Sequence, residues 1–344
     1  MSGAVRDSIR GSPSAPDAGL RALAAGLPSD RWSRWDIALW LAATLAYFAF
    51  PAHRVLGSQV IITILFALSL DLVLGYAGIV SLGHAAFFGL GAYTAGILSV
   101  HGWGEPLSGL VAAAVVAGVV GFLSSFLVVR GAALGQLMIT LGVGLLLKEV
   151  ANKADHWTGG VDGLTDMHMK PVLGAFDFDL AGNTAYLYSL VITLGAYLLL
   201  RRVVSSPFGL SLRAIREGAG RMPALGAPVN RRLVAAFTLA AVLAGVAGAL
   251  LTQTTQFVGL SVLDFDRSAG VTIMLVLGGT GRLYGAFVGA GLFMLLQDFL
   301  ARRDPVYWQL WLGVLLVAVV LIGRGGVLGI AETLRERGAQ RRAR

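Results

Sequence analysis

Apolar tracts long enough to cross a bilayer recur along most of this 344-residue chain. The core of a bilayer is about 30 Å thick, so a crossing helix needs about 20 predominantly apolar residues. Inside lipid every backbone N–H and C=O must be paired within the protein, and an α-helix achieves this within a single segment. Charged residues make up only 13% of the sequence, about half of what soluble domains carry. The sequence therefore predicts an all-α fold, a polytopic transmembrane helical bundle.

Ten apolar segments lie between residues 35 and 325, which we interpret as one transmembrane domain of about ten spans. The first and the eighth segments are short for a helix that crosses perpendicular to the bilayer. The eighth is therefore either a short span or a broken, re-entrant helix. The ten segments are residues 36–50, 58–75, 84–100, 106–129, 132–150, 185–200, 232–251, 269–280, 283–300 and 306–323.

The two ends of the chain lack such tracts. Residues 1–34 are rich in Ala, Gly, Ser, Pro and Arg, a composition that buries too little apolar surface to offset the entropy of ordering. We predict a flexible cytoplasmic tail here. The tail lacks the apolar stretch of a signal peptide, and an Arg- and Ser-rich transit peptide is the alternative. Residues 326–344 form a second, basic tail that we also expect in the cytoplasm.

The distribution of basic residues predicts the topology. A cytoplasmic N-terminus assigns to that side five arginines of the tail, Arg130, seven arginines of 201–232, Arg282 and six arginines of 324–344, which are 20 of the 27 Lys and Arg residues. Cytoplasmic segments are enriched in Lys and Arg, so we expect both termini in the cytoplasm, as an even number of spans requires. The net charge of +8 then follows from topology, and no nucleic-acid partner is expected.

Motifs for catalysis and nucleotide binding are absent from the sequence. None of the three lysines follows a glycine, so there is no G-x-x-x-x-G-K-[ST] loop, and neither H-E-x-x-H nor G-x-S-x-G occurs. The five histidines have no recognised metal-ligand spacing, and the chain has no cysteine. We expect no enzyme activity, no metal and no cofactor on this chain.

Few ionisable residues lie inside the predicted spans. Asp71 lies in the second span, Lys148 and Glu149 near the outer end of the fifth, and Asp298 near the outer end of the ninth. Carriers driven by protons or sodium keep ionisable groups near mid-membrane, so this scarcity favours a pathway energised from elsewhere. We interpret Lys148 and Glu149 as interfacial residues. Asp71 either caps a helix or bonds within the bundle, or it contacts a substrate.

Glycine clusters interrupt two of the predicted spans. LVLGYAGIVSLGHAAFFGLGAY (72–93) and LVLGGTGRLYGAFVGAGLF (275–293) both run from LVLG through a glycine-rich break into a small-residue helix. Close helix packing explains many such glycines, but paired broken spans in two halves of a transporter also mark its pathway. The predicted pathway residues are Asp71, Gly75, Tyr76, Gly78, Ser81, Gly83, His84, Gly278 and Gly279.

Two hydrophilic connections differ in character. Residues 151–184 contain TGGVDGL and five aspartates, so we expect an acidic extracytoplasmic loop. Residues 201–232 contain a helix start at Pro207 and then the amphipathic pattern SLRAIREG. This second connection is either a basic linker that holds topology or a docking element for a cytosolic partner. In the docking interpretation, the contacts come from Arg213, Arg216 and Glu217, and the turn back comes from Gly226.

The ordered set of motifs carries a family resemblance. GYAGIVSLGHAAFFGLGAYTAGIL (75–98), TGGVDGL (158–164), SPFGLSLRAIRE (206–217), LGGTGRLYGAFVGA (277–290) and RGGVLG (324–329) occur in this order. Together they resemble the permeases of branched-chain amino acid ABC importers, specifically the M-type subunit. The resemblance implies a multi-pass permease of the bacterial inner membrane. It also implies an H-type permease subunit as partner, two cytosolic ATPases that hydrolyse the ATP, and a periplasmic binding protein.

One segment departs from the family pattern. EGAGRMPALG (217–226) has Gly218 in place of Asn, and it has Arg221-Met222 in place of paired alanines. This change falls within the segment expected to dock on the ATPase. Relatives in the family carry urea or short amides, which is the alternative substrate class. A stand-alone secondary carrier or channel is the alternative of a different class. A membrane enzyme is disfavoured because no acid, histidine or nucleophile cluster occurs at one interface.

Overall fold

The computed structural model describes residues 34–172, 174, 176–179 and 181–322. Apart from Arg34, the predicted tails 1–34 and 326–344 lie outside these residues. Within the described part the fold is helical, and its only extended pairing consists of isolated bridges, so the all-α prediction is confirmed.

The helices are α2 (Arg34–Ala49), α3 (Arg54–Asp71), α4 (Ala85–Val100), α5 (Pro106–Arg130), α6 (Ala133–Lys153), α7 (Asp155–Thr158), α8 (Asn183–Ser205), α9 (Pro207–Gly218), α10 (Val229–Thr255), α11 (Phe265–Gly278), α12 (Leu283–Arg303) and α13 (Trp308–Ile322), with short helical segments η1 (Pro51–His53), η2 (Leu72–Tyr76), η3 (Pro223–Leu225) and η4 (Leu260–Leu263).

Among the described residues, six helical stretches are long and apolar enough to cross a membrane: Pro51–Tyr76, α5, α6, α8, α10 and α12. Each of the ten predicted segments corresponds to one helix, with bounds shifted by a few residues. The other four helices, α2, α4, α11 and α13, have only 16, 16, 14 and 15 residues. Since a perpendicular crossing needs about 20 residues, their crossing stays a prediction.

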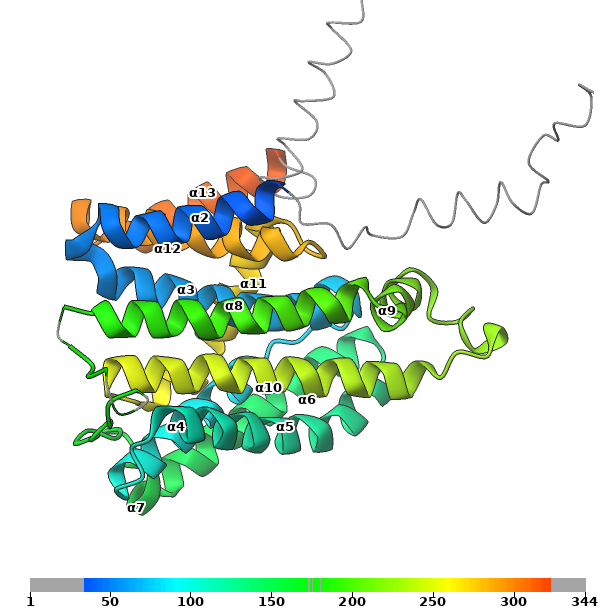
Figure 1. Cartoon of the computed structure of the whole chain (residues 1–344). Helices are drawn as coiled ribbons and strands as arrows, with labels where there is room; N and C mark the ends of the chain where they lie inside the picture. The colour runs from blue at the N-terminus through cyan, green and yellow to red at the C-terminus, as the bar shows by residue number, and fades with distance from the viewer. Residues whose placement is uncertain (1–33, 173, 175, 180, 323–344) are drawn as a thin grey trace, which may run out of the picture.

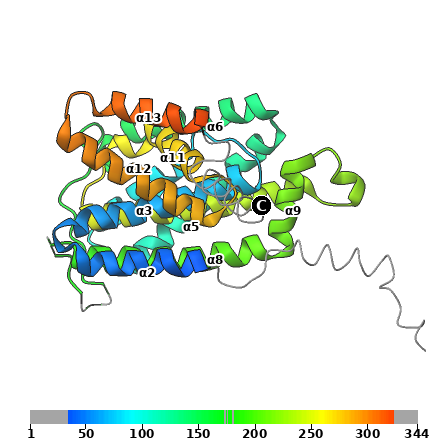
Figure 2. The same cartoon turned by 90° about the horizontal axis from the view of Figure 1, so that it is seen from above.

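Helix α3 lies at the centre of the bundle (Figure 1). It contacts α8 and α10 on one side and α11 and α12 on the other, while α13 packs on α12. The view from above shows α2 and α8 along one side of the molecule (Figure 2). Of the most apolar stretch of each helix, 67% is buried in the α3 and α10 spans but only 11% in α6. Helix α6 therefore presents most of its apolar side chains outward.

Small residues bring α4, α5 and α10 close together. A methyl group added at Gly91 of α4 would overlap the backbone of Gly245 in α10. One added at Gly248 would overlap the carbonyl oxygen of Phe88, and one at Gly245 would lie against Ala117 of α5. Helices in lipid associate through such close backbone approach, because burial from water supplies no drive between them. The glycines in this part of the bundle therefore serve packing, the alternative raised by the sequence.

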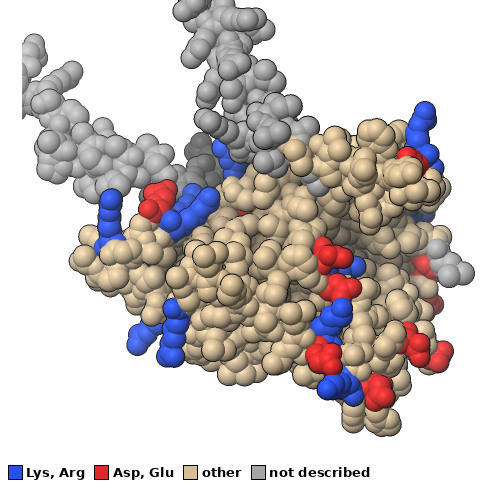
Figure 3. Space-filling model, turned by 180° about the vertical axis from the view of Figure 1, so that it is seen from behind, with Lys and Arg blue, Asp and Glu red and all other residues tan. Residues whose placement is uncertain are grey.

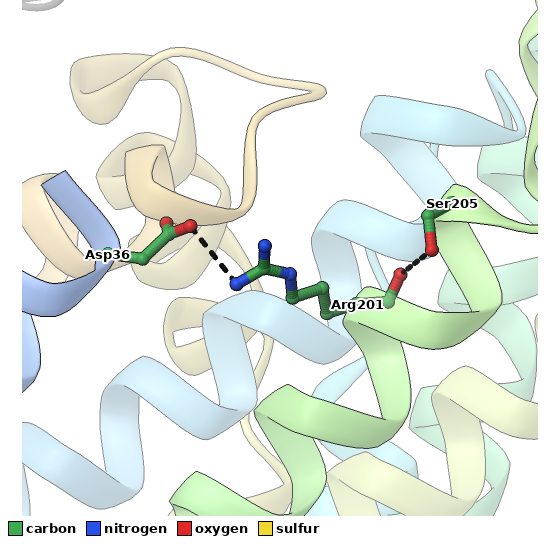
Figure 4. Close-up of polar contacts among 3 residues, drawn as sticks. All are labelled: Asp36, Arg201 and Ser205. Atoms are coloured by element: carbon green, nitrogen blue, oxygen red, sulfur yellow. Dashed lines mark hydrogen bonds and ion pairs between the residues drawn. The ribbon is translucent and has the colours of Figure 1, made fainter. Parts of the chain in front are cut away.

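Helix α2 is attached to the bundle by an ion pair and an aromatic cluster. Arg201 Nη1 of α8 lies 3.4 Å from Asp36 Oδ2, and the Arg201 carbonyl accepts a hydrogen bond from Ser205 Oγ (Figure 4). Trp40 packs edge-on against Tyr197 of α8 and Phe287 of α12, with ring centroids 5.6 and 5.1 Å away. These contacts place the start of α2 beside the end of α8, next to α9.

Charge separates the two ends of the molecule. On the face in Figure 3, Lys and Arg predominate at one end, acidic and basic side chains mix at the other, and a broad band between them lacks charge. Both ends of the described chain, the start of α2 and the end of α13, lie at the end that carries α9 (Figure 1). This arrangement agrees with an even number of crossings. Which side of a membrane that end faces stays a prediction.

Candidate functional site

The first glycine-rich break follows α3. The helix widens into the π-helical segment η2, in which the Ala77 N–H bonds to the carbonyl of Leu72, five residues earlier. Gly78 then adopts a left-handed backbone with φ of 76°, which residues with a Cβ rarely adopt. Residues 77–84 are not helical, and α4 begins at Ala85. Single π-helical turns inside helices occur often at functional sites.

The second break separates α11 from α12. Helix α11 ends at Gly278, after which Gly279 and Gly281 have φ of 102° and 79°. A methyl group at Gly278 would overlap the carbonyl oxygen of Gly285 in α12, so the two helices approach closely here. The short α11 fits the expectation of a short or broken eighth segment.

The two breaks contact each other through Asp71. Its side chain is fully buried, and Oδ1 accepts a hydrogen bond of 2.7 Å from the N–H of Gly281. A methyl group at Gly75 would overlap this carboxylate oxygen and would lie 2.5 Å from the Gly281 nitrogen. The absence of a side chain at Gly75 therefore permits the hydrogen bond. The sequence left open whether Asp71 bonds within the bundle or contacts a substrate. The structure shows a bond within the bundle, from the Gly281 N–H to Asp71 Oδ1.

Helix α9 lies in the connection between α8 and α10, and it contacts the place where the two breaks meet. The Arg216 guanidinium donates a hydrogen bond to the Gly75 carbonyl, and its side-chain stem passes over Gly78. The Arg213 guanidinium lies 5.0 Å from the ring centroid of Tyr76. Both arginines attract the buried Asp71 carboxylate electrostatically. Predicted pathway residues and predicted coupling residues thus form one contact cluster, the α9 junction, which comprises Asp71, Gly75, Tyr76, Gly78, Arg213, Arg216 and Gly281.

The remaining coupling residues lie on the outer side of this connection. Helix α9 begins at Pro207, as predicted, and buries Leu212 and Ile215. Glu217 is exposed and has no bonding partner among the described residues, and Leu210 on the same helix face is 45% exposed. Gly226 has φ of 75° and turns the chain back toward α10.

The far end of the first break is held by α6 and α11. A methyl group at Gly83 would overlap the carbonyl oxygen of Thr140, and Thr140 Oγ1 accepts a 3.2 Å hydrogen bond from the Leu82 N–H. The Ala85 N–H donates to Ser268 Oγ at 2.8 Å. The break is therefore bounded by backbone and hydroxyl contacts on both sides.

His84 and Ser81 are buried inside this break. His84 Nε2 lies 2.9 Å from Ser69 Oγ, and its ring stacks on Phe66 with centroids 5.6 Å apart. The Ser81 hydroxyl is buried with no hydrogen-bond partner among the described residues. Since this histidine and serine contact no acidic side chain of a described residue, the described residues form no triad-like nucleophile geometry here. Within the described part of the chain, no group of three or more His, Cys, Asp or Glu could hold a metal ion.

The TGGVDGL motif closes onto the chain between α10 and η4. Thr158 Oγ1 donates to the Ala151 carbonyl at 2.5 Å, and the Leu164 N–H donates to the Val258 carbonyl at 2.8 Å. Gly163, with φ of 75°, lies directly against that carbonyl. The motif is thus a packed turn at the end of the bundle opposite α9 (Figure 1).

Sequence reasoning missed partners that lie far away along the chain. Gly281 stands inside the quoted TGRLYG pattern, but no sequence signal pairs it with Asp71, 210 residues earlier. Thr140 and Ser268 show no distinguishing pattern at all. A cavity of about 800 Å³ between α3, α4, α11, α12 and α13 was also missed, and none of the predicted pathway residues lines it.

Comparison with known proteins gives the same family as the motifs. Residues 55–321 match the family described as "Branched-chain amino acid transport system / permease component". The chain is 29% identical to the high-affinity branched-chain amino acid transport system permease protein LivM of Salmonella typhimurium, over 79% of this chain and 69% of that protein. It is 28% identical to LivM of Escherichia coli over the same shares. It is 31% identical to the autoinducer 2 import system permease protein LsrC of an Enterobacter species, over 83% and 82%. No solved structure matches the chain.

Proposed function

We propose that this chain, which belongs to the branched-chain amino acid transport system permease family, is a membrane subunit of an ATP-binding-cassette importer. In this proposal it conducts a branched-chain or related small amino acid across the bacterial inner membrane. An H-type permease subunit completes the pathway, a periplasmic binding protein delivers the substrate, and two cytosolic ATPases hydrolyse the ATP. This chain binds no cofactor and is not an enzyme.

The α9 junction is the observation that carries the proposal. Helix α9 bonds through Arg216 to the first break, which itself bonds through Asp71 to the second. A force applied to α9 therefore reaches both broken spans through backbone groups. Rigid elements joined by such contacts move together when an interface shifts. A permease that receives its energy by contact needs this connection between a cytosolic helix and its pathway.

The exposed side of α9 suits a protein partner. Leu210 is 45% exposed and Leu225 of η3 is 78% exposed, with the unpaired Glu217 carboxylate nearby in sequence. Protein contact surfaces combine an apolar core with a polar rim, and this surface has both kinds of side chain. We assign this surface to the ATPase, rather than the arginine contacts that Arg213 and Arg216 make with the first break. The segment that departs from the family pattern, residues 217–226, adjoins this surface and contains the short helix η3.

Vectorial uptake in proteoliposomes tests the proposal. The chain is reconstituted with the products of the neighbouring permease and ATPase genes, binding protein is added outside, and ATP inside. Leucine uptake that requires ATP and the ATPases supports the importer. Uptake by the single chain in response to a proton or sodium gradient would establish the secondary-carrier alternative instead. Competition by excess urea, acetamide or autoinducer 2 separates the substrate classes, the last because of the LsrC relatives.

A further inference from the structure

A partly buried arginine faces the large cavity. Arg267 lies in the first turn of α11, and its guanidinium carbon lies 5.0 Å from the ring centroid of Phe88. It forms no side-chain hydrogen bond or ion pair with any residue in the described ranges. The neighbouring carboxylate, Asp264, is paired with Lys148 of α6 at 2.5 Å. Asp264 lines the same cavity and attracts the Arg267 guanidinium electrostatically. Among the described residues the guanidinium nevertheless makes no hydrogen bond or ion pair, so its donors are available to a ligand in the cavity.

The rest of the cavity offers complementary chemistry. Its volume of about 800 Å³ lies in the range of small-molecule sites. Apolar walls come from Phe66, Val271 and Met274, and Asp266 adds an exposed carboxylate. A cation, an anion and an apolar wall within one cavity match the carboxylate, ammonium and side chain of an apolar amino acid. An unpaired guanidinium in a partly desolvated site binds a carboxylate strongly because it can donate two parallel hydrogen bonds.

The cavity also adjoins the first break. Phe66 forms its wall and stacks on His84, and it packs on Phe88 with centroids 4.7 Å apart. Ser268, the residue after Arg267, accepts the hydrogen bond from the Ala85 N–H at the start of α4. The cavity wall therefore reaches the first break through Phe66, whose ring stacks on His84.

We propose that this cavity binds the transported molecule and that Arg267 binds its carboxylate. The proposal rests on the proposed function, because it names the substrate as an amino acid, and it adds a site that excludes substrates without a carboxylate.

Cysteine protection tests the site directly. The chain has no cysteine of its own, so Thr63→Cys in the cavity wall gives a single reporter on α3. The variant is assembled with its partner permease and ATPases, without binding protein, and modification of this chain by a small thiol reagent is timed. Leucine should slow the modification, whereas leucinamide, which lacks the carboxylate, should not. Adding Arg267→Met should raise the leucine concentration needed for protection by about tenfold or more. Arg303→Met, an exposed arginine on α12, serves as the matched control and should leave protection unchanged.

Three outcomes would overturn the assignment: equal protection by leucine and leucinamide, no protection by either, or full protection in the Arg267→Met background. If the Arg267→Met variant fails to assemble, the comparison of leucine with leucinamide in the Thr63→Cys chain that retains Arg267 still tests the assignment. Arg267→Lys, which keeps the charge but loses the forked donors, should give intermediate protection. Leucine uptake by the complete importer is measured in parallel. Uptake without protection would refute only the proposed site, whereas absence of uptake would refute the proposed function.

Discussion

Gly75→Ala should disable the α9 junction. The backbone at Gly75 is not left-handed, so alanine is acceptable there and only contacts decide the outcome. The new methyl group would overlap Asp71 Oδ1 and lie 2.5 Å from the Gly281 nitrogen. Overpacking of a tight site costs about 1–3 kcal/mol, and leaving a buried donor or acceptor unsatisfied costs about 1–3 kcal/mol. The arrangement in which both breaks contact α9 therefore loses about 2–6 kcal/mol.

Such a loss corresponds to a factor of about 25 or more in the population of that arrangement, since each 1.4 kcal/mol is tenfold. We expect leucine uptake in proteoliposomes to fall at least tenfold and the purified assembly to denature at a lower temperature. Gly195→Ala on the exposed side of α8, where nothing lies within 4 Å, is the matched control and should behave like the unsubstituted chain.

A double variant separates this cause from general damage. Asp71→Ala removes the overlapped oxygen, so the costs of Asp71→Ala and Gly75→Ala should combine to less than their sum. Strictly additive costs, or unchanged uptake and thermal stability in Gly75→Ala, would refute the contact reasoning.

Three further changes probe other parts of the molecule. Gly83→Val should abolish uptake with insertion and assembly intact, because its side chain would overlap the Thr140 carbonyl; full uptake would reduce this segment to ordinary helix packing. Glu217→Arg should leave ATP hydrolysis running without uptake, measured as the ratio of phosphate released to leucine imported, and an unchanged ratio would place the ATPase contact elsewhere. Single cysteines at Gly3 and Ala343 should resist a membrane-impermeant thiol reagent added from outside, and labelling of either would overturn the predicted topology.

Local signals in the sequence identified the helices well because each depends on its own residues. Apolar length marks a helix in lipid, Pro207 marks a helix start, and the clusters near Gly78 and Gly279 mark places where helical hydrogen bonding stops. These features require no knowledge of neighbours, since the backbone of a helix is satisfied within the segment. The family resemblance follows from the same ordered motifs.

What the sequence by itself determined is therefore the helical class, the positions of the breaks and of α9, and the family. Only the tertiary structure decided which of these elements touch. Asp71 and Gly281 are 210 residues apart, and the contact of Arg216 with Gly75 depends on how α3 and α9 pack. Arg267 is the clearest case: it is one of the seven Lys and Arg residues that remain for the outer side once the predicted topology assigns 20 of the 27 to the cytoplasm. Its value as a site arises because folding pairs Asp264 with Lys148 and places Phe88 beneath the guanidinium. Long-range partners are selected by packing, and no local pattern of residues encodes that choice.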